Sequence, residues 1–393
     1  MNFIVNQTTR FSSVLIFFVT FTVYSPALHG EFIWDDDPHV LHIAKLESFD
    51  GLKRIWFKLG STLEYYPMLF STFWIERHLP GDSPLRYQAV NILSHCSNAI
   101  LLQKILTRLT IPGAVWAAAI FALHPVHVES VAWITERKNC LSAFFYFLSL
   151  LAYLRFAGIG VEVLRVSAKI KTKNYIYAFI FFIAAVLSKT VTCTLPAAIL
   201  LLTWWKNKGL TWKQIWPTLP FFIAGICLSI ITYWVETRFV GAAGPEWNFH
   251  WTERFLIAGR ALWFYIGKIL WPQPLIFTYP RWDLDPTDVV QFIFPISFLL
   301  FVLFLWCNRS KWGYGPLTGV LFFAGTLAFL PIFLANLIFA ERFGGEKDST
   351  VAFGANLLGA VLGGLLEYTA LLVGYRSLLF IVAAAYALAF ISD

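Results

Sequence analysis

FSSVLIFFVTFTVYSPALHG, residues 11–30, runs directly into EFIWDDDPHV, residues 31–40. An apolar run of about 20 residues is long enough to cross the hydrocarbon core of a bilayer as a helix. Three consecutive aspartates, Asp35, Asp36 and Asp37, then follow at the point where the chain would leave the membrane. The stretch therefore indicates a membrane protein that places a carboxylate cluster at the membrane surface.

The composition extends this interpretation to the whole chain. Of the 393 residues, 58% are hydrophobic and only 13% are charged, whereas a soluble domain carries roughly 25% charged residues. The predicted fold is therefore all-α and polytopic, with about 11 transmembrane helices and two large external loops. The predicted spans lie near 12–29, 86–107, 112–128, 140–157, 174–188, 191–205, 217–235, 289–306, 316–339, 354–374 and 377–391. A retained first helix is a simpler reading of the N-terminus than a cleaved signal peptide.

The basic residues predict the orientation of these spans. The net charge is +7, but the bases sit in short gaps between apolar runs, which points to membrane topology and not to nucleic acid. A cytoplasmic N-terminus leaves the base-rich gaps inside, as the positive-inside rule requires. It places the acid-rich loop 31–85 outside, so the three aspartates face the external side. The five cysteines fall in or beside apolar runs and are read as small buried hydrophobes.

One apolar segment, RFLIAGRALWFYIGKILW (254–271), is interrupted by Arg260 and Lys268. Counting it as a span would place Asp283, Asp285 and Asp288 in the cytoplasm. We therefore predict a helix that lies in the membrane interface, with its aromatic residues at headgroup level. Residues 236–288 then form the second large external loop.

Four external patches carry polar residues where polarity is costly. They are WDDDPH (34–39), HPVHVESVAWITERKN (124–139), SKT (188–190), and the loop from Glu246 to YPRWD (279–283). Taken alone, each patch could have an ordinary structural role, such as a solvated helix end or an interfacial anchor. Together they supply a carboxylate that could accept a proton, bases that could hold a phosphate, and aromatic surfaces for a sugar and a lipid.

The chain resembles one family at several blocks, among them FIWDDDPHV, EYYPMLFSTFWIERHLPG, LHPVHVESVAWITERKN, LSKTVTCTLPAAILLL and ALWFYIGKILWPQPLIFTYPRW. These resemble bacterial polytopic relatives of the transmembrane and tetratricopeptide-repeat O-mannosyltransferases, within the GT-C glycosyltransferase superfamily. The likeness runs over roughly residues 12–325 and is most specific in the HPVHVESVAWITERKN block.

The resemblance implies a GT-C-like membrane domain over residues 1–330 that takes a sugar, mannose among the candidates, from a polyprenyl-phosphate donor. The acceptor would be a hydroxyl of a protein or a surface glycan, and the site would face the exterior of a bacterial inner membrane. The residues that this implies are catalytic Asp35, Asp36 and Glu129, the phosphate-binding Arg137, Lys138 and Arg281, and the supporting His124, His127, Tyr66 and Tyr279.

Within the triplet, Asp36 is the expected base, because it pairs with Asp35 in the two-aspartate pattern of the relatives. Asp37 precedes Pro38, which favours an extended backbone, and we expect Asp37 to turn towards solvent.

Two features depart from the family. The second span reads Tyr87-Gln88 where relatives usually have Tyr-His, and residues 331–393 form an atypical pair of helices that looks like the membrane portion of spermidine-synthase-like proteins. Two alternatives stay open: a transporter or flippase for a lipid-linked sugar, for which His95 and Glu367 are the plausible interior polar residues, and a non-catalytic membrane scaffold. A divalent metal is neither required nor excluded.

Overall fold

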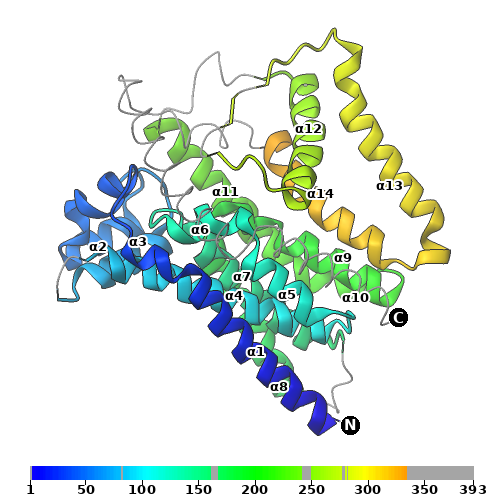
Figure 1. Cartoon of the computed structure of the whole chain (residues 1–393), viewed down its shortest axis with the longest axis horizontal. Helices are drawn as coiled ribbons and strands as arrows, with labels where there is room; N and C mark the ends of the chain where they lie inside the picture. The colour runs from blue at the N-terminus through cyan, green and yellow to red at the C-terminus, as the bar shows by residue number, and fades with distance from the viewer. Residues whose placement is uncertain are drawn as a thin grey trace.

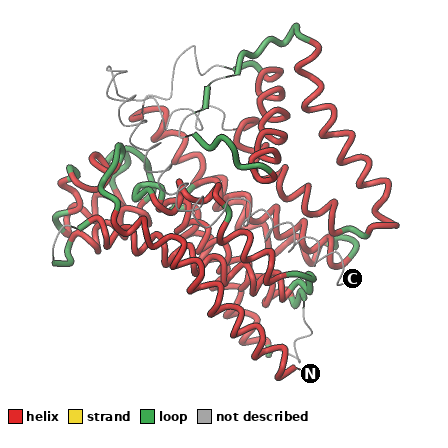
Figure 2. The backbone as a smooth tube through the Cα atoms, viewed as in Figure 1, coloured by secondary structure: helices red, strands yellow, loops and turns green. Residues whose placement is uncertain are grey.

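The computed structural model describes residues 2–80, 83–160, 167–240, 249–276, 279–280 and 282–333. Every regular element in these residues is a helix, and the coloured part of the tube in Figure 2 contains no strand. The predicted all-α class is confirmed. The α-helices are α1 (Asn2–Tyr24), α2 (Phe49–Phe57), α3 (Pro67–Arg77), α4 (Pro84–Arg108), α5 (Ala114–Leu123), α6 (Val128–Ala132), α7 (Arg137–Ala157), α8 (Ala168–Val186), α9 (Leu195–Asn207), α10 (Trp212–Ile215), α11 (Leu219–Val235), α12 (Trp251–Leu270), α13 (Ile293–Trp312) and α14 (Gly315–Phe333).

Four helical stretches of the described residues are long and apolar enough to cross a membrane. They are Arg10–His29, Arg137–Ala157, Trp212–Phe239 and Val289–Trp312. A further pair, Ala114–Leu123 and Pro125–Ala132, passes the same test but is bent by 50° at the break between its helices. Proline cannot donate a backbone hydrogen bond and its ring clashes with the preceding turn, so Pro125 explains the break. The chain is therefore a membrane protein, with four or five such spans in the residues described.

Each predicted span up to residue 333 coincides with helical structure, but not each is apolar enough to count as a span. Helix α4 carries a polar stripe of Asn91, His95 and Asn98, spaced by four and three residues and thus on one face. The three side chains donate to the carbonyls of Trp133 (3.0 Å), Ala122 (2.9 Å) and Cys140 (2.8 Å). Helix α4 is consequently an internal helix, held to α5 and α7 by its amides and imidazole.

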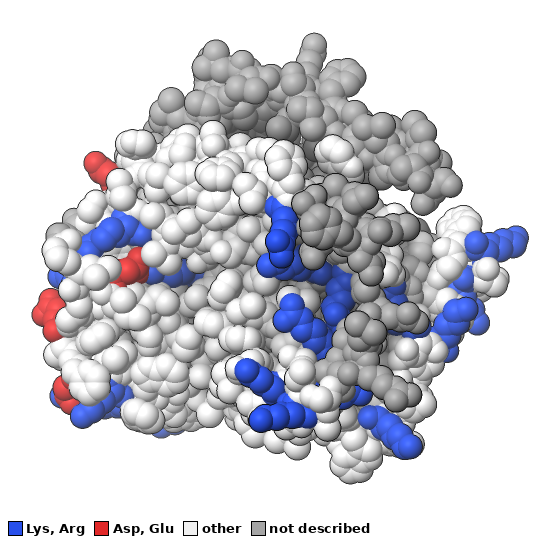
Figure 3. All heavy atoms as spheres, turned by 90° about the horizontal axis from the view of Figure 1, so that it is seen from below, with Lys and Arg blue, Asp and Glu red and all other residues white. Residues whose placement is uncertain are grey.

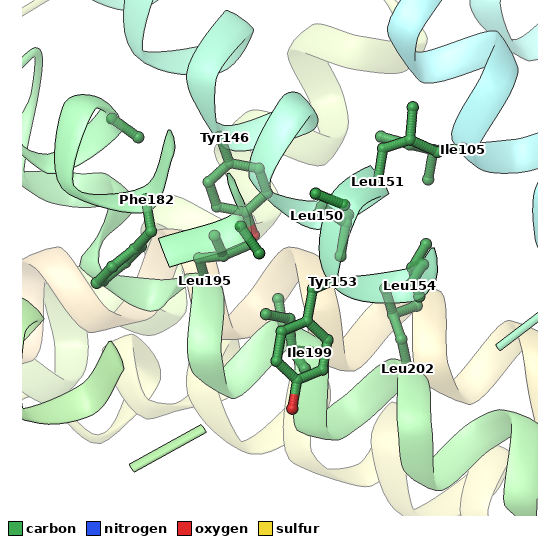
Figure 4. Packing of buried hydrophobic residues seen from close by; sticks show 14 of the residues in the cluster. Ile105, Tyr146, Leu150, Leu151, Tyr153, Leu154, Phe182, Leu195, Ile199 and Leu202 are labelled. Atoms are coloured by element: carbon green, nitrogen blue, oxygen red, sulfur yellow. The ribbon is translucent and has the colours of Figure 1, made fainter. Parts of the chain in front are cut away.

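The main hydrophobic core lies where α4, α7, α8 and α9 meet. Helix α7 contributes Tyr146, Leu150 and Leu154, and Figure 4 shows them packed with Phe182 of α8 and with Leu195, Ile199 and Leu202 of α9. Helix α7 ends at Ala157 and is capped by Gly158, which has a φ of 67° and so adopts the left-handed conformation that glycine tolerates best. This core holds together the helices that carry the candidate site at their ends.

The first predicted external loop is folded and has a core of its own. Its buried residues include Val40, Leu46, Ile55, Leu69 and Phe70. Helix α2 begins at a Ser48 cap, whose hydroxyl accepts from Gly51 N at 3.0 Å. Figure 1 places α2 and α3 together at one end of the helical bundle. Asp36 is buried beside this core, so the aspartate stretch is more than a solvated helix end.

Helices α12, α13 and α14 pack against one another and form a group beside the main bundle (Figure 1). The segment 254–271 is helical, as predicted. Its two interrupting bases lie over aromatic rings: Arg260 is 4.9 Å from the centre of Trp282, and Lys268 is 5.2 Å from the centre of Tyr279. Such contacts suit bases at a membrane interface, and the position of α12 relative to the bilayer stays a prediction. The predicted C-terminal unit, residues 331–393, lies outside the described residues from position 334 onward.

The lower face of the molecule is basic. Figure 3 shows Lys and Arg spread across it, with Asp and Glu at the edge towards which Figure 1 places α2 and α3. Lys169, Lys171 and Lys173 at the start of α8, and Lys208 and Lys213 around α10, are exposed bases of gaps predicted to be cytoplasmic.

Two glycines of α12 give a matched test of its packing. A Cβ at Gly259 would lie 2.5–2.6 Å from Pro295 Cβ, Cα and N, so the start of α13 would have to move, whereas a Cβ at Gly267 would meet nothing within 4 Å. We expect Gly259→Ala to destabilise the protein by about 1–3 kcal/mol through overpacking. Gly267→Ala should be neutral or stabilising by up to about 1 kcal/mol, since alanine favours the helix. Thermal unfolding in detergent measures both, and equal melting temperatures would contradict the close packing of α12 on α13.

Candidate active site

Asp36 joins the aspartate stretch to the segment that precedes α7. Its side chain is fully buried. One oxygen, Oδ2, accepts from Ile33 N at 2.9 Å, and the other, Oδ1, accepts from both the backbone N (2.9 Å) and the hydroxyl of Thr135. Burial raises the pKa of Asp36 to about 6, against the opposing effect of these hydrogen bonds. Asp36 therefore clamps two segments that are 99 residues apart in the sequence.

The three aspartates occupy three different environments. Asp35 is half-buried and Asp37 is exposed, while Asp36 between them is sealed from solvent. Trp34 has a φ of 44°, in the left-handed region, and its ring stacks on Trp133 at 5.5 Å. Asp37 does face solvent, as expected, but the expected reason is wrong: Asp37–Leu41 is a π-helical turn and not an extended segment. Asp36 is the residue just before this turn, and the three side chains therefore differ in burial.

Arg137 is fully buried at the start of α7, and its guanidinium is completely engaged. Nε donates to Asn91 Oδ1 (2.8 Å), Nη1 donates to Thr72 Oγ1 (3.1 Å) and to Glu76 Oε2, and Nη2 donates to Glu76 Oε1 (3.1 Å) and to Tyr87 O (2.8 Å). A guanidinium has about five N–H donors, so none is left for a ligand in this conformation. The geometry therefore indicates that Arg137 forms a structural ion pair with Glu76. The sequence had suggested that Arg137 binds a phosphate.

Lys138, the next residue, is also buried and paired. Its Nζ lies 3.2 Å from Glu64 Oε1 and 3.5 Å from Glu136 Oε1. Asn139 continues the network, because its amide donates to Glu136 Oε2 and to Ser130 Oγ (2.9 Å) and its Oδ1 accepts from Lys189 Nζ (2.8 Å). The ERKN segment (136–139) is thus the centre of a buried charge cluster.

The remaining expected residues fall into separate groups. His124 Nε2 donates to Ile269 O of α12 at 2.9 Å, and the His127 ring lies 4.6 Å from that of Phe121. Glu129 is half-buried on α6, one residue before Ser130 of the charge cluster. A cavity shared by Asp35, Asp36 and Glu129 stays a prediction.

The two expected tyrosines serve as packing and anchoring residues. Tyr66 is buried in the core of the first loop, and the Tyr279 hydroxyl donates to Pro274 O at 3.0 Å. Arg281 lies outside the described residues. No group of three or more His, Cys, Asp or Glu within the described part of the chain is arranged to hold a metal ion.

Sequence reasoning missed Glu64 and Glu76 as partners of the two buried cations. A signal for Glu76 does exist: with Leu69 and Phe73 it follows the spacing of four and three residues that places side chains on one helix face. That face is buried, so an acid on it requires a buried cation. Thr135 and Lys189 lie in two of the polar patches found in the sequence, but their partners are remote in the sequence and could not be predicted from it.

The Arg137–Glu76 pair predicts a large stability effect. Arg137→Ala would leave the buried carboxylate of Glu76 without its cation, and we expect a loss of about 3–5 kcal/mol in unfolding free energy. The control is Arg54→Ala, which removes an exposed pair with Asp50 at 2.8 Å and should cost at most about 0.5 kcal/mol. Denaturant or thermal unfolding in detergent checks both. A mild effect at Arg137 would mean that the pair is not formed.

The raised pKa of Asp36 predicts a pH dependence of stability. The folded-state pKa of about 6 lies above the 3.8 of an ordinary aspartate, so the folded protein binds this proton more tightly. The protonated Asp36 side chain contributes at most about 3 kcal/mol to the free energy of unfolding. This contribution is fully present below pH 3.8 and is lost as the pH rises through 6. As the pH rises from 3.8 to about 6, the melting temperature of wild type should therefore fall relative to that of Asp36→Asn. Parallel curves for the two proteins would show that the pKa of Asp36 is not raised.

Comparison with known proteins finds similarity over about a third of the chain. The chain is 29% identical over 167 residues to protein O-mannosyl-transferase TMTC4 of Mus musculus. The aligned region covers 36% of this chain and 22% of that protein. The chain is 31% identical over 145 residues to TMTC1 of Homo sapiens (34% and 16%) and 30% identical over 149 residues to Tmtc1 of Drosophila melanogaster (35% and 17%), both also protein O-mannosyl-transferases. The matches span at most 22% of the length of these three relatives. No protein-family model and no solved structure matches.

Proposed function

We propose that this chain is a membrane glycosyltransferase that transfers mannose from a polyprenyl-phosphate donor to a hydroxyl of a protein. One observation carries the proposal: Asp36 binds Thr135, and so the aspartate stretch meets the segment that leads into ERKN. Both blocks are among those that resemble O-mannosyltransferases, and the block that ends in ERKN is the most specific of them. Similarity to proteins named protein O-mannosyl-transferases supports the same reaction class.

In the proposed reaction the acceptor oxygen attacks the anomeric carbon of the donor sugar. The bond between that carbon and the phosphate oxygen breaks, polyprenyl phosphate leaves, and a carboxylate takes the hydroxyl proton. We assign this base to Asp35, with Glu129 as the supporting acid. Asp36 was the expected base, but its two oxygens already accept three hydrogen bonds in a sealed position. Asp36 is a positioning residue that holds Asp35 at the end of the first span.

The proposal includes the finer features that the resemblance implies. The membrane domain would have a GT-C-like arrangement with about 11 spans, and the site would face the external side, which is the periplasm in a bacterium. The basic lower face in Figure 3 supports this orientation, because exposed Lys and Arg favour the cytoplasmic side. His95 would be the interior polar residue of a transporter, but it bonds to Ala122 O inside the bundle, so it gives no support to that alternative.

The test compares the three aspartates in a transfer assay. Purified full-length protein is given a radiolabelled polyprenyl-phosphate mannose and a Ser/Thr-rich acceptor peptide. Loss of a general base typically costs about 10²–10⁴-fold in rate, so we expect Asp35→Asn to lose transfer by that factor while its melting temperature stays unchanged. Asp37→Asn is the matched control and should keep most activity, because Asp37 is exposed.

Equal and mild effects at Asp35 and Asp37 would reject Asp35 as the base. Transfer that is undetectable in wild type with mannose and other sugars on the same carrier would reject the glycosyltransferase proposal.

A further inference from the structure

The short connection between α8 and α9 forms hydrogen bonds with three other helices. Leu187 O accepts from Met68 N of α3 at 3.2 Å. Thr190 Oγ1 donates to Thr232 Oγ1 of α11 at 3.0 Å. Between them, Lys189 Nζ donates to Asn139 Oδ1 of α7 at 2.8 Å. The contacts of Leu187 and Thr190 hold the chain on both sides of Lys189, and the Lys189 side chain extends from there to Asn139.

Lys189 lies at the edge of the buried charge cluster. Asn139, its partner, also donates to Glu136 and to Ser130. Ser130 follows Glu129 on α6, and Glu136 is the neighbour of Lys138 within the cluster. The ammonium group is therefore one side chain away from the segment that carries Glu129, and it is half-buried where Arg137 and Lys138 are fully buried.

The bonding of Lys189 differs from that of the two buried cations. Every N–H of the Arg137 guanidinium donates to a protein acceptor. Lys138 is paired with Glu64 and Glu136. Lys189 has one hydrogen bond, to the neutral amide of Asn139, and the structure pairs it with no carboxylate among the described residues. An ammonium has about three donors, so two remain for an anionic ligand. A lysine of this kind binds phosphate as a point charge.

We propose that Lys189, positioned by Asn139, binds the phosphate of the polyprenyl-phosphate donor. This assignment rests on the proposed function and gives the SKT connection a role that the expected site residues did not include. Arg137 and Lys138 then hold the shape of the site, and Lys189 supplies the charge that the ligand meets.

The experiment measures binding and not transfer. Purified full-length protein in detergent is titrated with a short-chain polyprenyl phosphate that carries no sugar, and in parallel with the matching polyprenol. We expect wild type to prefer the phosphate. Lys189→Met keeps the length of the side chain without its charge and should lose about 10- to 100-fold in affinity for the phosphate, the size of one charge-assisted hydrogen bond, with no change for polyprenol. Lys189→Arg should retain most of the preference.

Lys173→Met, at an exposed lysine near the start of the same α8, is the control and should bind as wild type does. The inference is overturned if Lys189→Met, at an unchanged melting temperature, binds the phosphate as tightly as wild type. It is also overturned if wild type does not distinguish phosphate from polyprenol. If phosphate binding depends on Lys189 but the protein shows no transferase activity, the inference about Lys189 stands and the proposed function is rejected.

Discussion

The folded first loop depends on a salt bridge that is removed from water. Arg137 and Glu76 are both buried, and an unpaired charge in such a place costs several kcal/mol. Helix α3 supplies the acid, α7 supplies the base, and Asn91 of α4 holds the guanidinium from a third side. The three helices are therefore fixed to one another at their ends on the side of the loop. The clamp between Asp36 and Thr135, two residues before Arg137, then sets the aspartate stretch on this frame.

The class of the fold could be predicted from the sequence, because the length of apolar runs decides where helices form in a membrane. The run from residue 11 and the runs in α7, α11 and α13 each became a helix long enough to span. The side-chain chemistry was harder to predict. The ERK segment suggests two free cations beside an acid. In the structure Arg137 pairs with Glu76, and Lys138 pairs with Glu64 as well as with Glu136 of the same segment. A local pattern can indicate that Glu76 needs a buried cation, but it cannot identify which cation, because that choice depends on tertiary packing.

The aspartate triplet shows how a local rule can predict a result for the wrong reason. The residue before proline was expected to be extended, and Asp37 was expected outside for that reason. Asp37 is exposed at the start of a π-helical turn, and His39 and Val40 of the same turn are buried. Adjacent identical residues thus acquire different properties from burial alone: one carboxylate is a sealed anchor, one is half-buried and one is solvated.

The polar face of α4 has a consequence for the biogenesis of the protein. Amide and imidazole groups in a lipid environment need hydrogen-bond partners. Asn91, His95 and Asn98 find theirs in carbonyls of residues 122–140. During synthesis α4 leaves the ribosome before the residues that carry these carbonyls, so α4 cannot rest alone in the bilayer at low cost. Its stable insertion must wait for α5 and α7, and the chain from α4 to α7 would enter the membrane as one cooperative unit.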